Sequence, residues 1–449
     1  MSKPSIPQGT RDFTPEQVAK RTYIFDTIKK VFMKYGFQPI ETPTMENLST
    51  LTGKYGEEGD KLLFKVLNNG DYLSKVNPSV YDEKNSSKMI SQICDRGLRY
   101  DLTVPFARFV VMHQNEIAFP FKRYQIQPVW RADRPQRGRY REFYQCDADV
   151  VGSNSLVYEA ELAQIYDEVF EKLGLNVVIK INNRKILFGM AEAAGIPEKF
   201  TDMTVAIDKL DKIGWEGVEK ELTEREIPDS AIQMIAQLLK VTNLSDLEKF
   251  GDKSPSLLKG IEELLTFHQY FDLKQNKNEV KFDITLARGL NYYTGCIFEV
   301  AAKDVKMGSI GGGGRYDDLT GVFGLKNVSG VGISFGADRI YDCLEELGLF
   351  PEEAQQSLQV LFVAMDEASH LYSFKALTQV REAGINADIY PEPAKMKKQL
   401  DYADKRKVPY VVIIGSEETQ TGLLAFKNMV SGEQQKLDLD KIIEVLRGI

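Results

Sequence analysis

Cysteine and histidine are scarce in this chain of 449 residues. The four cysteines, Cys94, Cys146, Cys296 and Cys343, lie far apart and form no C-x-x-C pair. We therefore expect buried reduced thiols and no metal site. The three histidines occur in no H-E-x-x-H pattern or triad-like setting, which argues against hydrolysis with a histidine base. An enzyme built on this sequence must work through carboxylates, arginines and backbone groups.

Long apolar runs are also missing. No segment approaches the ~20 apolar residues of a membrane-spanning helix, and the opening MSKPSIPQGTRDF lacks the apolar stretch of a signal peptide. We therefore expect a cytoplasmic protein without a membrane partner. The composition, 43% hydrophobic and 27% charged, is that of a globular protein. Because the net charge is −8, any nucleic acid must meet a local basic patch.

The chain length predicts roughly three domains at about 150 residues each. After a first helix at 11–35 and a strand at 37–46, strand-like runs at 98–104, 121–133 and 141–152 carry alternating polar residues, a pattern typical of an antiparallel sheet with one face toward a ligand. A charged, helical stretch then separates these strands from others that resume near 280. Beyond it, strand–helix alternation predicts a small α/β domain. The expected division is a core of 1–182 and 278–350, an inserted helical domain of 183–277, and a C-terminal domain of 357–449.

The segment 121–141, FKRYQIQPVWRADRPQRGRYR, has seven Lys/Arg residues against one acid, Asp133. Pro135 and Gly138 predict a loop between two strands. An arginine-rich hairpin binds phosphates and stacks on a nucleobase, but a solvated charged hairpin has the same composition. Arg131 ends a strand and is expected to point toward the working face of the sheet.

Two further segments are compatible with a ligand site. GSIGGGGRYDDLTG (308–321) has four consecutive glycines, which permit close approach either of a ligand or of two strands. It fits neither the P-loop nor the dinucleotide pattern. LARGLNYYTG (286–295) contains one arginine and two tyrosines. These residues either neutralise a phosphate and wall a polar ring pocket or form an aromatic core beside a surface arginine.

Polar residues also alternate along the predicted strand at 141–152. Gln145, Asp147 and Asp149 share one of its faces, and that face is either a polar site or exposed to solvent. Arg339, in the GADRI segment that opens a helix, allows the same two interpretations.

Together these segments resemble the histidyl-tRNA synthetase family of class II aminoacyl-tRNA synthetases over essentially the whole chain. QGTRDFTPEQ and GFQPIETPTME are similar to the family's start and motif 1, the 121–152 segment to motif 2, and VGISFGADRI to motif 3. LARGLNYYTG and GGGGRYDDL are similar to the two signatures that separate the histidine enzyme from other class II synthetases. The resemblance implies an α+β catalytic domain on an antiparallel sheet flanked by helices, with a helical insertion and a C-terminal α/β anticodon-binding domain.

The resemblance also implies an activity. A histidine–tRNA ligase forms histidyl-adenylate and pyrophosphate from L-histidine and ATP with Mg²⁺, then transfers the histidyl group to the 3′ end of tRNA(His). No tightly bound cofactor is implied. Displacement at phosphorus requires positioning and charge neutralisation more than a proton-transfer residue, which agrees with the scarcity of histidine. The implied partners are L-histidine, ATP, tRNA(His) and, through motif 1, a second copy of the chain.

Residue roles follow by match to the family's motifs. A catalytic role falls to Arg131 and to Arg288, which stands where other class II enzymes place a metal ion against the α-phosphate. ATP binding falls to Arg131 at the α-phosphate, Arg339 at the γ-phosphate, Asp133 and Arg139. Histidine binding falls to Asp101, Leu102, Thr103, Gln145, Asp149, Tyr292 and Tyr293. We expect Arg134, Arg137, Lys397, Lys398 and Lys405 to contact tRNA.

Three positions depart from the family pattern. Asn291 replaces an aspartate that is common in the family, and this changes the electrostatics of the pocket only if the side chain faces it. Asp101 and Asp149 replace the glutamates of many bacterial members, which we interpret as a subgroup trait.

In the C-terminal domain, 395–407 holds six basic residues against two acids. This charge pattern is typical either of a phosphate-contacting face or of a solvated helix.

Other functions compete with this interpretation. A synthetase-like regulatory subunit, as in the histidine-biosynthesis paralogue, typically lacks the anticodon domain and loses motif arginines, whereas Arg131, Arg288 and Arg339 are all present here. Prolyl, threonyl or glycyl enzymes share the C-terminal domain but are disfavoured by the two signatures. A class I synthetase lacks support because no KMSKS-like segment occurs.

Overall fold

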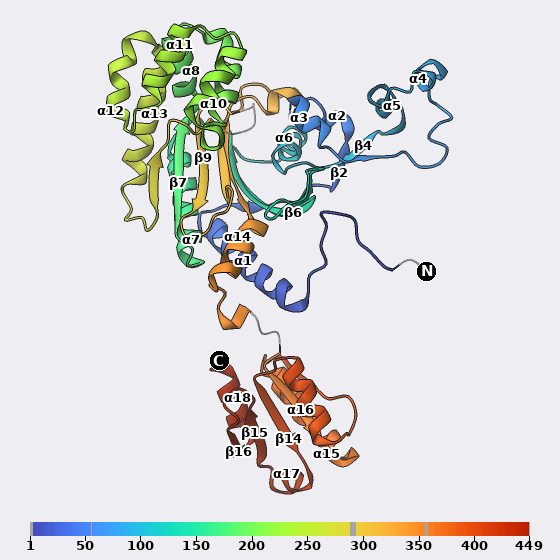
Figure 1. The fold of residues 1–449 in the computed structure, drawn as a ribbon. Helices are drawn as coiled ribbons and strands as arrows, with labels where there is room; N and C mark the ends of the chain where they lie inside the picture. Colours follow the sequence, from blue (N-terminus) through green and yellow to red (C-terminus); the bar gives the residue numbers. More distant parts are fainter. Residues whose placement is uncertain (1–2, 55, 288–292, 355–357, 449) are drawn as a thin grey trace. The chain divides into compact units, whose positions relative to one another are not determined.

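The computed structural model describes residues 3–54, 56–287, 293–354 and 358–448. The chain divides into two compact units (Figure 1). The large unit consists of Met1–Asp12 and Tyr23–Leu349, and the small unit of Phe13–Thr22 and Phe350–Ile449. Because the helical segment belongs to the same unit as the sheet, the division into core, insertion and C-terminal domain stays a prediction.

An eight-stranded sheet forms the centre of the large unit, in the order β1-β5-β6-β11-β10-β9-β7-β8. The edge pairs β1/β5 and β7/β8 are parallel, and the other neighbours are antiparallel. The predicted antiparallel sheet with flanking helices is thereby confirmed. Its strands are β1 (Gln38–Pro39), β5 (Phe121–Trp130), β6 (Glu142–Val151), β7 (Val177–Asn183), β8 (Glu279–Phe282), β9 (Cys296–Ala302), β10 (Gly311–Tyr316) and β11 (Gly330–Gly336).

Helices α1 (Pro15–Lys34) and α7 (Val157–Lys172) contribute rings to one face of this sheet. Phe335 on β11 contacts Phe32 of α1 and Tyr166 and Phe170 of α7, with ring centroids 5.8, 4.7 and 5.6 Å apart. These aromatic side chains are buried. Since such burial stabilises by about 1.5–3 kcal/mol for each large side chain, this layer forms a major part of the core.

Strand β6 shows how the sheet separates its two faces. Cys146, Ala148 and Val150 are buried and alternate with the polar residues Gln145, Asp147 and Asp149. Side chains of a strand point alternately to opposite faces. The polar residues therefore share one face, as predicted, and the apolar residues lie on the other.

The glycine run forms strand β10 between β9 and β11. A Cβ atom added to Gly313 would lie 2.2 Å from the carbonyl oxygen of Gly332, and one added to Gly314 would lie 2.7 Å from that of Cys296. Both distances are shorter than non-bonded atoms tolerate. The sequence left open whether these glycines allow close approach of a ligand or of two strands. At Gly313 and Gly314 they allow close approach of two strands.

The stretch after β7 is helical, as predicted, and gathers at one end of the sheet (Figure 1). Helices α8 and α13 pack closely, because Gly189 faces the backbone of Leu257 and Gly260 faces Ile186. The helices are α8 (Arg184–Ala193), α9 (Phe200–Ile207), α10 (Leu210–Glu224), α11 (Asp229–Leu238), α12 (Leu244–Leu247) and α13 (Pro255–Phe271).

The predicted strand at 98–104 is wrong over most of its length. The strand β4 (Arg96–Leu98) is short, and helix α6 begins at Thr103. The Asp101 carboxylate accepts a hydrogen bond from the backbone N–H of Val104 at 3.1 Å, and Pro105 lies in the first turn, both of which favour a helix start. Asp101 and Thr103 therefore enter the site from a helix N-terminus.

The predicted strand at 37–46 is also interrupted. Its two ends form β1 and β2 (Met45–Asn47), which belong to different sheets. Pro39 and Pro43 lack the N–H that a continuous strand would donate.

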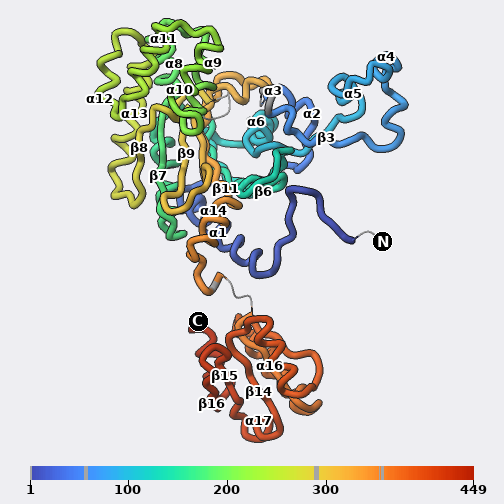
Figure 2. Tube along the Cα trace, in the orientation of Figure 1, coloured from blue at the N-terminus to red at the C-terminus, as the bar shows by residue number. Residues whose placement is uncertain are grey.

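Helix α2 contacts strands β2 and β4 of the small sheet β2-β4-β3, whereas α14 contacts β6 and β11 of the large sheet. Helices α4 and α5 extend away from the rest of the unit (Figure 2). The bounds are β3 (Lys65–Val66), α2 (Leu48–Leu51), α3 (Gly56–Lys61), α4 (Pro78–Asp82), α5 (Ser86–Ile93), α6 (Thr103–Met112) and α14 (Ala337–Leu347).

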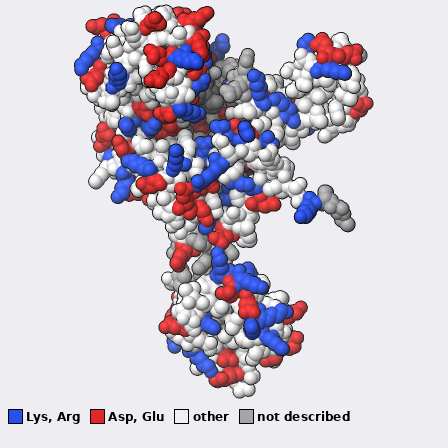
Figure 3. Space-filling view, in the orientation of Figure 1, with Lys and Arg blue, Asp and Glu red and all other residues white. Residues whose placement is uncertain are grey.

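The small unit contains a five-stranded sheet in the order β13-β12-β14-β15-β16. The predicted strand–helix alternation is present, with β12 parallel to both neighbours, and an antiparallel hairpin follows it. The elements are β12 (Val360–Ala364), β13 (Ala387–Ile389), β14 (Tyr410–Ile414), β15 (Leu424–Asn428), β16 (Gln434–Leu437), α15 (Glu367–Glu382), α16 (Met396–Lys405), α17 (Ser416–Thr421) and α18 (Leu439–Arg447). On the face of this unit that Figure 3 shows, acidic and basic side chains are interspersed.

Among the helices of the described residues, none is long and apolar enough to cross a lipid bilayer. The four cysteines are buried, and none of them forms a disulfide bond.

Candidate active site

A cleft of about 570 Å³ opens on the polar face of the eight-stranded sheet. Strands β6, β10 and β11, the loop after β5, the β4–α6 junction and the start of α14 all contribute to its lining. The predicted site residues that line it are Asp101, Thr103, Arg131, Asp133, Arg139, Gln145, Tyr293 and Arg339. Residues far apart in sequence thus meet in one cavity large enough for a ligand of nucleotide size.

Arg131 is held rigidly at one side of the cleft. It follows the last residue of β5, and its Nε donates a hydrogen bond to the Tyr100 carbonyl at 3.0 Å. Its guanidinium carbon lies 4.2 Å from the centroid of the Tyr100 ring and 5.2 Å from that of Phe143. Stacking between two aromatic rings leaves the remaining N–H groups in a fixed orientation.

Arg339, in the first turn of α14, closes another side of the cleft. Its Nε donates to the Gly138 carbonyl and its Nη1 to the Ser309 carbonyl, each at 2.6 Å. The pKa of Arg339 is lowered, because it is buried and because the positive charges of Arg139 and Arg131 repel a further proton. Three guanidinium groups therefore share one space, which favours a polyanion there.

Asp133 and Arg139 lie beside these groups in the hairpin loop. Arg139 Nη1 is 3.7 Å from Asp133 Oδ1. Arg134 and Arg137 of the same loop are exposed and do not line the cleft. Arg137 forms an ion pair with Glu346 of α14. Both interpretations of the hairpin therefore apply to part of it, since Arg131 and Arg139 line the cleft whereas Arg134 and Arg137 are exposed.

The opposite part of the cleft is polar. Gln145 Nε2 donates to the Ser334 hydroxyl at 3.0 Å, while its Oε1 is buried without a hydrogen-bond partner. Thr103 and Tyr293 line the same region. Asp101 is 2% exposed, so its carboxylate faces the protein and the cleft rather than solvent.

A small hollow of about 20 Å³ continues from this polar part. Asp147 and Asp149 line it, together with Thr103, Tyr293 and Ser334, which also line the large cleft. Arg123, completely buried on β5, places its Nη2 2.8 Å from Asp149 Oδ2. The Tyr316 hydroxyl donates to Asp149 Oδ1 at 2.7 Å.

Among the described residues, two that were predicted to bind histidine, Leu102 and Asp149, do not line the large cleft, and Asp149 lines the small hollow instead. Leu102 is completely buried and absent from the lining; its carbonyl accepts a 3.5 Å hydrogen bond from Arg123 Nη2. Arg288 and Tyr292 lie outside the described residues, as does Asn291.

The sequence did not predict that Arg11, near the N-terminus, contacts two residues that line the cleft. Arg11 forms an ion pair with Asp338 of α14, and its guanidinium carbon lies 3.3 Å from the Tyr140 ring centroid. Asp338 Oδ2 also accepts from the Tyr144 backbone N–H at 3.0 Å. Asp338 and Tyr140 both line the cleft. No local spacing in the sequence could pair Arg11 with a residue more than three hundred positions away.

The predicted lysines lie on α16 of the small unit. Lys397, Lys398 and Lys405 are exposed, while Gln399 and Ala403 of the same helix are completely buried. One face of α16 therefore packs on the sheet and the other presents basic side chains.

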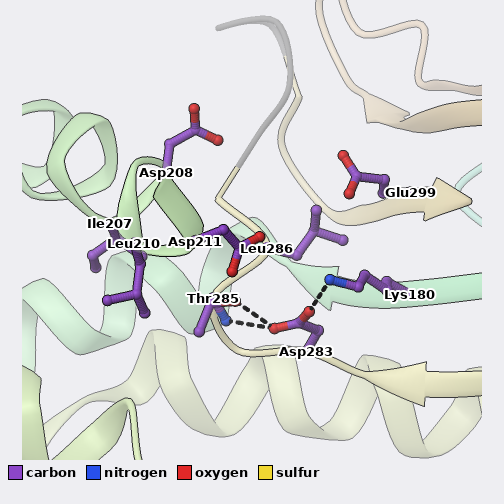
Figure 4. Close-up of a pocket in the computed structure, with 9 residues that line it drawn as sticks. All are labelled: Lys180, Ile207, Asp208, Leu210, Asp211, Asp283, Thr285, Leu286 and Glu299. Atoms are coloured by element: carbon purple, nitrogen blue, oxygen red, sulfur yellow. Dashed lines mark hydrogen bonds and ion pairs between the residues drawn. The ribbon is translucent and has the colours of Figure 1, made fainter. Parts of the chain in front are cut away.

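A second, much smaller hollow of about 10 Å³ lies beside the helical segment (Figure 4). Lys180 Nζ is 2.8 Å from Asp283 Oδ2, and the Thr285 hydroxyl donates to Asp283 Oδ1 at 2.6 Å. Burial raises the pKa of Asp283, but these contacts outweigh it and the pKa is lowered. Room for about one water excludes this hollow as the site of a nucleotide. In the described part of the chain, no cluster of His, Cys, Asp and Glu is arranged to hold a metal.

The antiparallel sheet, the arginine-lined cleft on its polar face and the appended α/β unit define a class II aminoacyl-tRNA synthetase. The family model described as "Histidyl-tRNA synthetase" matches residues 84–340, and the "Anticodon binding domain" model matches residues 359–449. A relative from Phocaeicola vulgatus named "Histidine--tRNA ligase" is 56% identical and is aligned over 100% of both chains. The chain belongs to the histidyl-tRNA synthetase family.

Solved structures agree on the fold. The crystal structure of a histidyl-tRNA synthetase from Nostoc sp. PCC 7120 matches with a TM-score of 0.85 and 32% identity, covering 100% of both chains. An ATP phosphoribosyltransferase regulatory subunit/histidyl-tRNA synthetase from Bacillus halodurans C matches with a TM-score of 0.70 and 18% identity, covering 92% of this chain and 100% of that one. The second likeness shows the fold alone.

Proposed function

We propose that this chain is a histidine–tRNA ligase. It activates L-histidine with ATP to histidyl-adenylate and pyrophosphate, then transfers the histidyl group to the 3′ end of tRNA(His). The observation that carries the proposal is the single cleft in which guanidinium groups occupy one part and uncharged and acidic hydrogen-bonding groups occupy another. A triphosphate matches the first part and an amino acid with a polar side chain matches the second. We also infer that the enzyme acts in the cytoplasm.

The phosphate end lowers the barrier by charge neutralisation. We propose that Arg131 binds the α-phosphate, where negative charge develops when the histidine carboxylate attacks, and that Arg339 binds the γ-phosphate of the leaving pyrophosphate. Asp133 and Arg139 complete the ATP site, and Arg288 would join Arg131 at the α-phosphate. Because arginine stays charged and needs no proton transfer, no general base is required.

Mg²⁺ would arrive with ATP and neutralise phosphate charge. Asp133 lines the cleft beside Arg139, and its ion pair with Arg139 is long at 3.7 Å. One carboxylate fits this role, since Mg²⁺ is commonly held by one or two carboxylates plus phosphates and water.

The polar end selects the amino acid. We propose that Asp101, Thr103 and Gln145 receive the α-ammonium group and that Asp149 lies at the imidazole end. Tyr292 and Tyr293 would wall the ring, and Leu102 would contribute through its backbone. Buried groups left unpaired by an apolar isostere give strong rejection, so no separate editing site is required.

The experiment that tests this function is ATP–pyrophosphate exchange with each of the twenty amino acids, using the full chain. We expect exchange with histidine and background rates with all others. Exchange with proline, threonine or glycine instead would refute the assignment. Absence of exchange with every amino acid would favour the regulatory subunit, whose fold this chain shares.

We propose that the small unit contacts tRNA through the exposed face of α16, with Arg134 and Arg137 as further contacts on the large unit. Replacing Lys397, Lys398 and Lys405 together by glutamate should lower the rate of tRNA charging about tenfold or more at moderate salt, since phosphate contacts dominate affinity. Histidine-dependent exchange should stay within twofold of wild type. A matched control replaces Glu367, Glu382 and Asp440 of the same unit by lysine. Equal loss of charging and exchange in the glutamate variant would contradict the role.

We further infer a homodimer formed through motif 1, which corresponds to α1 and β1. The resemblance of these segments to the family's dimer-forming helix and strand supports it. The position of β1 as the edge strand next to β5 supports the same inference, because an edge strand has unpaired backbone groups that a second chain can contact.

A further inference from the structure

Helix α14 contacts the β5–β6 hairpin with three acidic side chains spaced four residues apart, Asp338, Asp342 and Glu346. This spacing places them on one face of the helix. Asp338 Oδ2 accepts from the Tyr144 backbone N–H at 3.0 Å, and Asp342 Oδ2 accepts from the Tyr140 hydroxyl at 3.0 Å. Glu346 forms an ion pair with Arg137. The acidic face therefore fixes α14 relative to the hairpin.

Asp338 differs from the other two acids because it is buried, with 3% of its surface exposed. Arg11, from the N-terminal segment, forms an ion pair with it. The same guanidinium stacks on the Tyr140 ring, with its central carbon 3.3 Å from the ring centroid. Arg11 thus contacts the helix and the hairpin simultaneously.

The segment that carries Arg11 is held against the hairpin by its backbone. The Gly9 carbonyl accepts from the Arg141 backbone N–H at 2.9 Å, and the Gln8 carbonyl accepts from Arg141 Nη1 at 3.3 Å. A Cβ atom on Gly9 would lie 2.8 Å from Arg141 Cγ, and its φ of +85° favours glycine. The Arg141 carbonyl in turn accepts from the Arg131 backbone N–H at 3.0 Å. The N-terminal segment is therefore joined to the strand end that carries Arg131.

We propose that Arg11 is a positioning residue for the ATP site, which fixes the hairpin of Arg131 against the helix of Arg339. This inference rests on the proposed function, which assigns ATP to the guanidinium-lined cleft. It goes beyond that function because Arg11 itself is not part of the cleft lining. Arg11 acts through Tyr140 and Asp338, both of which line the cleft.

Two physical effects make ATP the substrate that depends on Arg11. Arg131 and Arg339 come from different elements, so they contact two phosphates of one nucleotide only while the spacing of these elements is kept. In addition, Asp338 carries a buried negative charge beside the space for a polyanion. Without Arg11, that charge loses a cationic partner and repels phosphate.

The histidine site should change little when Arg11 is removed. Asp101 and Thr103 enter the cleft at the β4–α6 junction. This junction carries neither Tyr140 nor Asp338, through which Arg11 acts. A loss confined to ATP therefore distinguishes positioning of the phosphate end from a general disturbance of the cleft.

The test compares histidine-dependent ATP–pyrophosphate exchange by full-length wild type, Arg11→Ala and Arg11→Lys. We expect Arg11→Ala to raise the KM for ATP about tenfold and to leave the KM for histidine within about twofold, as for a local misplacement of binding groups. Arg11→Lys should raise the KM for ATP about threefold, because lysine restores the charge beside Asp338 but not the planar stack on Tyr140.

Glu346→Gln is the matched control. It removes the ion pair between Glu346 and Arg137, which joins the same two elements but is exposed. Because an exposed ion pair contributes little, both KM values should be unchanged in this variant.

A double-mutant cycle with Asp338→Asn identifies how Arg11 acts. Asparagine keeps an acceptor for the Tyr144 N–H and removes the negative charge. In this background, Arg11→Ala should raise the KM for ATP by only about threefold, the part due to the stack on Tyr140, since effects of contacting residues are not additive. A tenfold rise in both backgrounds would overturn the inference.

Binding of α,β-methylene-ATP, measured by calorimetry without histidine, separates this inference from the proposed function. Arg11→Ala should raise the Kd of this analogue by the same factor as the KM for ATP. A Kd within twofold of wild type, or equal rises in the KM for ATP and for histidine, would overturn the inference. Failure of wild type to exchange with histidine would instead refute the proposed function. If thermal melting shows that Arg11→Ala is unfolded, Arg11→Lys decides, and a Kd within twofold of wild type again overturns the inference.

Discussion

Arg131→Ala should lower histidine-dependent ATP–pyrophosphate exchange by about three orders of magnitude, the effect typical of an arginine that neutralises a transferring phosphoryl group. The guanidinium is already fixed by the Tyr100 carbonyl and by two aromatic rings. Its interaction with the α-phosphate therefore needs little further ordering and strengthens as charge develops. Because the interaction is stronger in the transition state than in the ground state, the loss should appear mainly in kcat.

The control for Arg131 is Arg134→Ala in the same loop. Arg134 is exposed and outside the cleft lining, so exchange should be unchanged even though tRNA charging is affected. Arg131→Lys should recover only part of the activity, since a lysine cannot provide a planar fork between two rings. Exchange by Arg131→Ala within tenfold of wild type, with an unchanged melting temperature, would contradict its role at the α-phosphate.

Glu159→Ala should lower the free energy of unfolding by about 3–5 kcal/mol, the cost of leaving a buried charge without its partner. Glu159 on α7 is completely buried and Arg315 on β10 is 4% exposed. The two form a bidentate ion pair, with Arg315 Nη2 2.6 Å from Glu159 Oε2. Arg315 also donates to the Ser329 hydroxyl at 2.7 Å and to the Ser153 carbonyl at 2.9 Å. Without Glu159, this guanidinium keeps its neutral acceptors but loses the carboxylate that pairs with it directly.

Urea denaturation of wild type and variant measures this effect. Glu161→Ala on the same helix is the matched control, because its ion pair with Lys122 is 2.6 Å long but partly exposed. Such pairs contribute about 0–1 kcal/mol. The two variants should therefore differ by several kcal/mol although both remove a glutamate two positions apart. Similar decreases in the free energy of unfolding for both variants would show that burial does not determine how much such an ion pair stabilises the fold.

Periodicity predicted the sheet and helices wherever apolar residues repeat over a long segment. The β5–β6 hairpin and α7 are examples, since burial of one face dictates the pattern there. The prediction of a strand from periodicity was wrong at 98–104, where β4 ends at Leu98 and α6 starts at Thr103. Alternation of Tyr100, Asp101 and Leu102 looked like a strand, but an aspartate three residues before Val104 with Pro105 in the first turn is a helix-start signal that could have been used.

The cleft could be predicted in part for a similar reason. Arg131 and Arg339 lie in segments whose local pattern stands out, and the resemblance gave them roles that remain proposals. Contacts between segments that are far apart in the sequence could not be predicted, because the local spacing of residues does not indicate them. The ion pair of Arg11 with Asp338 and that of Arg123 with Asp149 belong to this group. Asp147 was placed on the correct face by alternation.

The glycines of β10 limit how this enzyme can be redesigned. A side chain at Gly313, which lines the small hollow, or at Gly314 would collide with the backbone of a neighbouring strand, so neither position can be used to reshape the site without separating the sheet. Altered amino-acid preference would have to be engineered from β6 and from the start of α6. Directed libraries should leave the glycine strand constant and vary the wall that faces it.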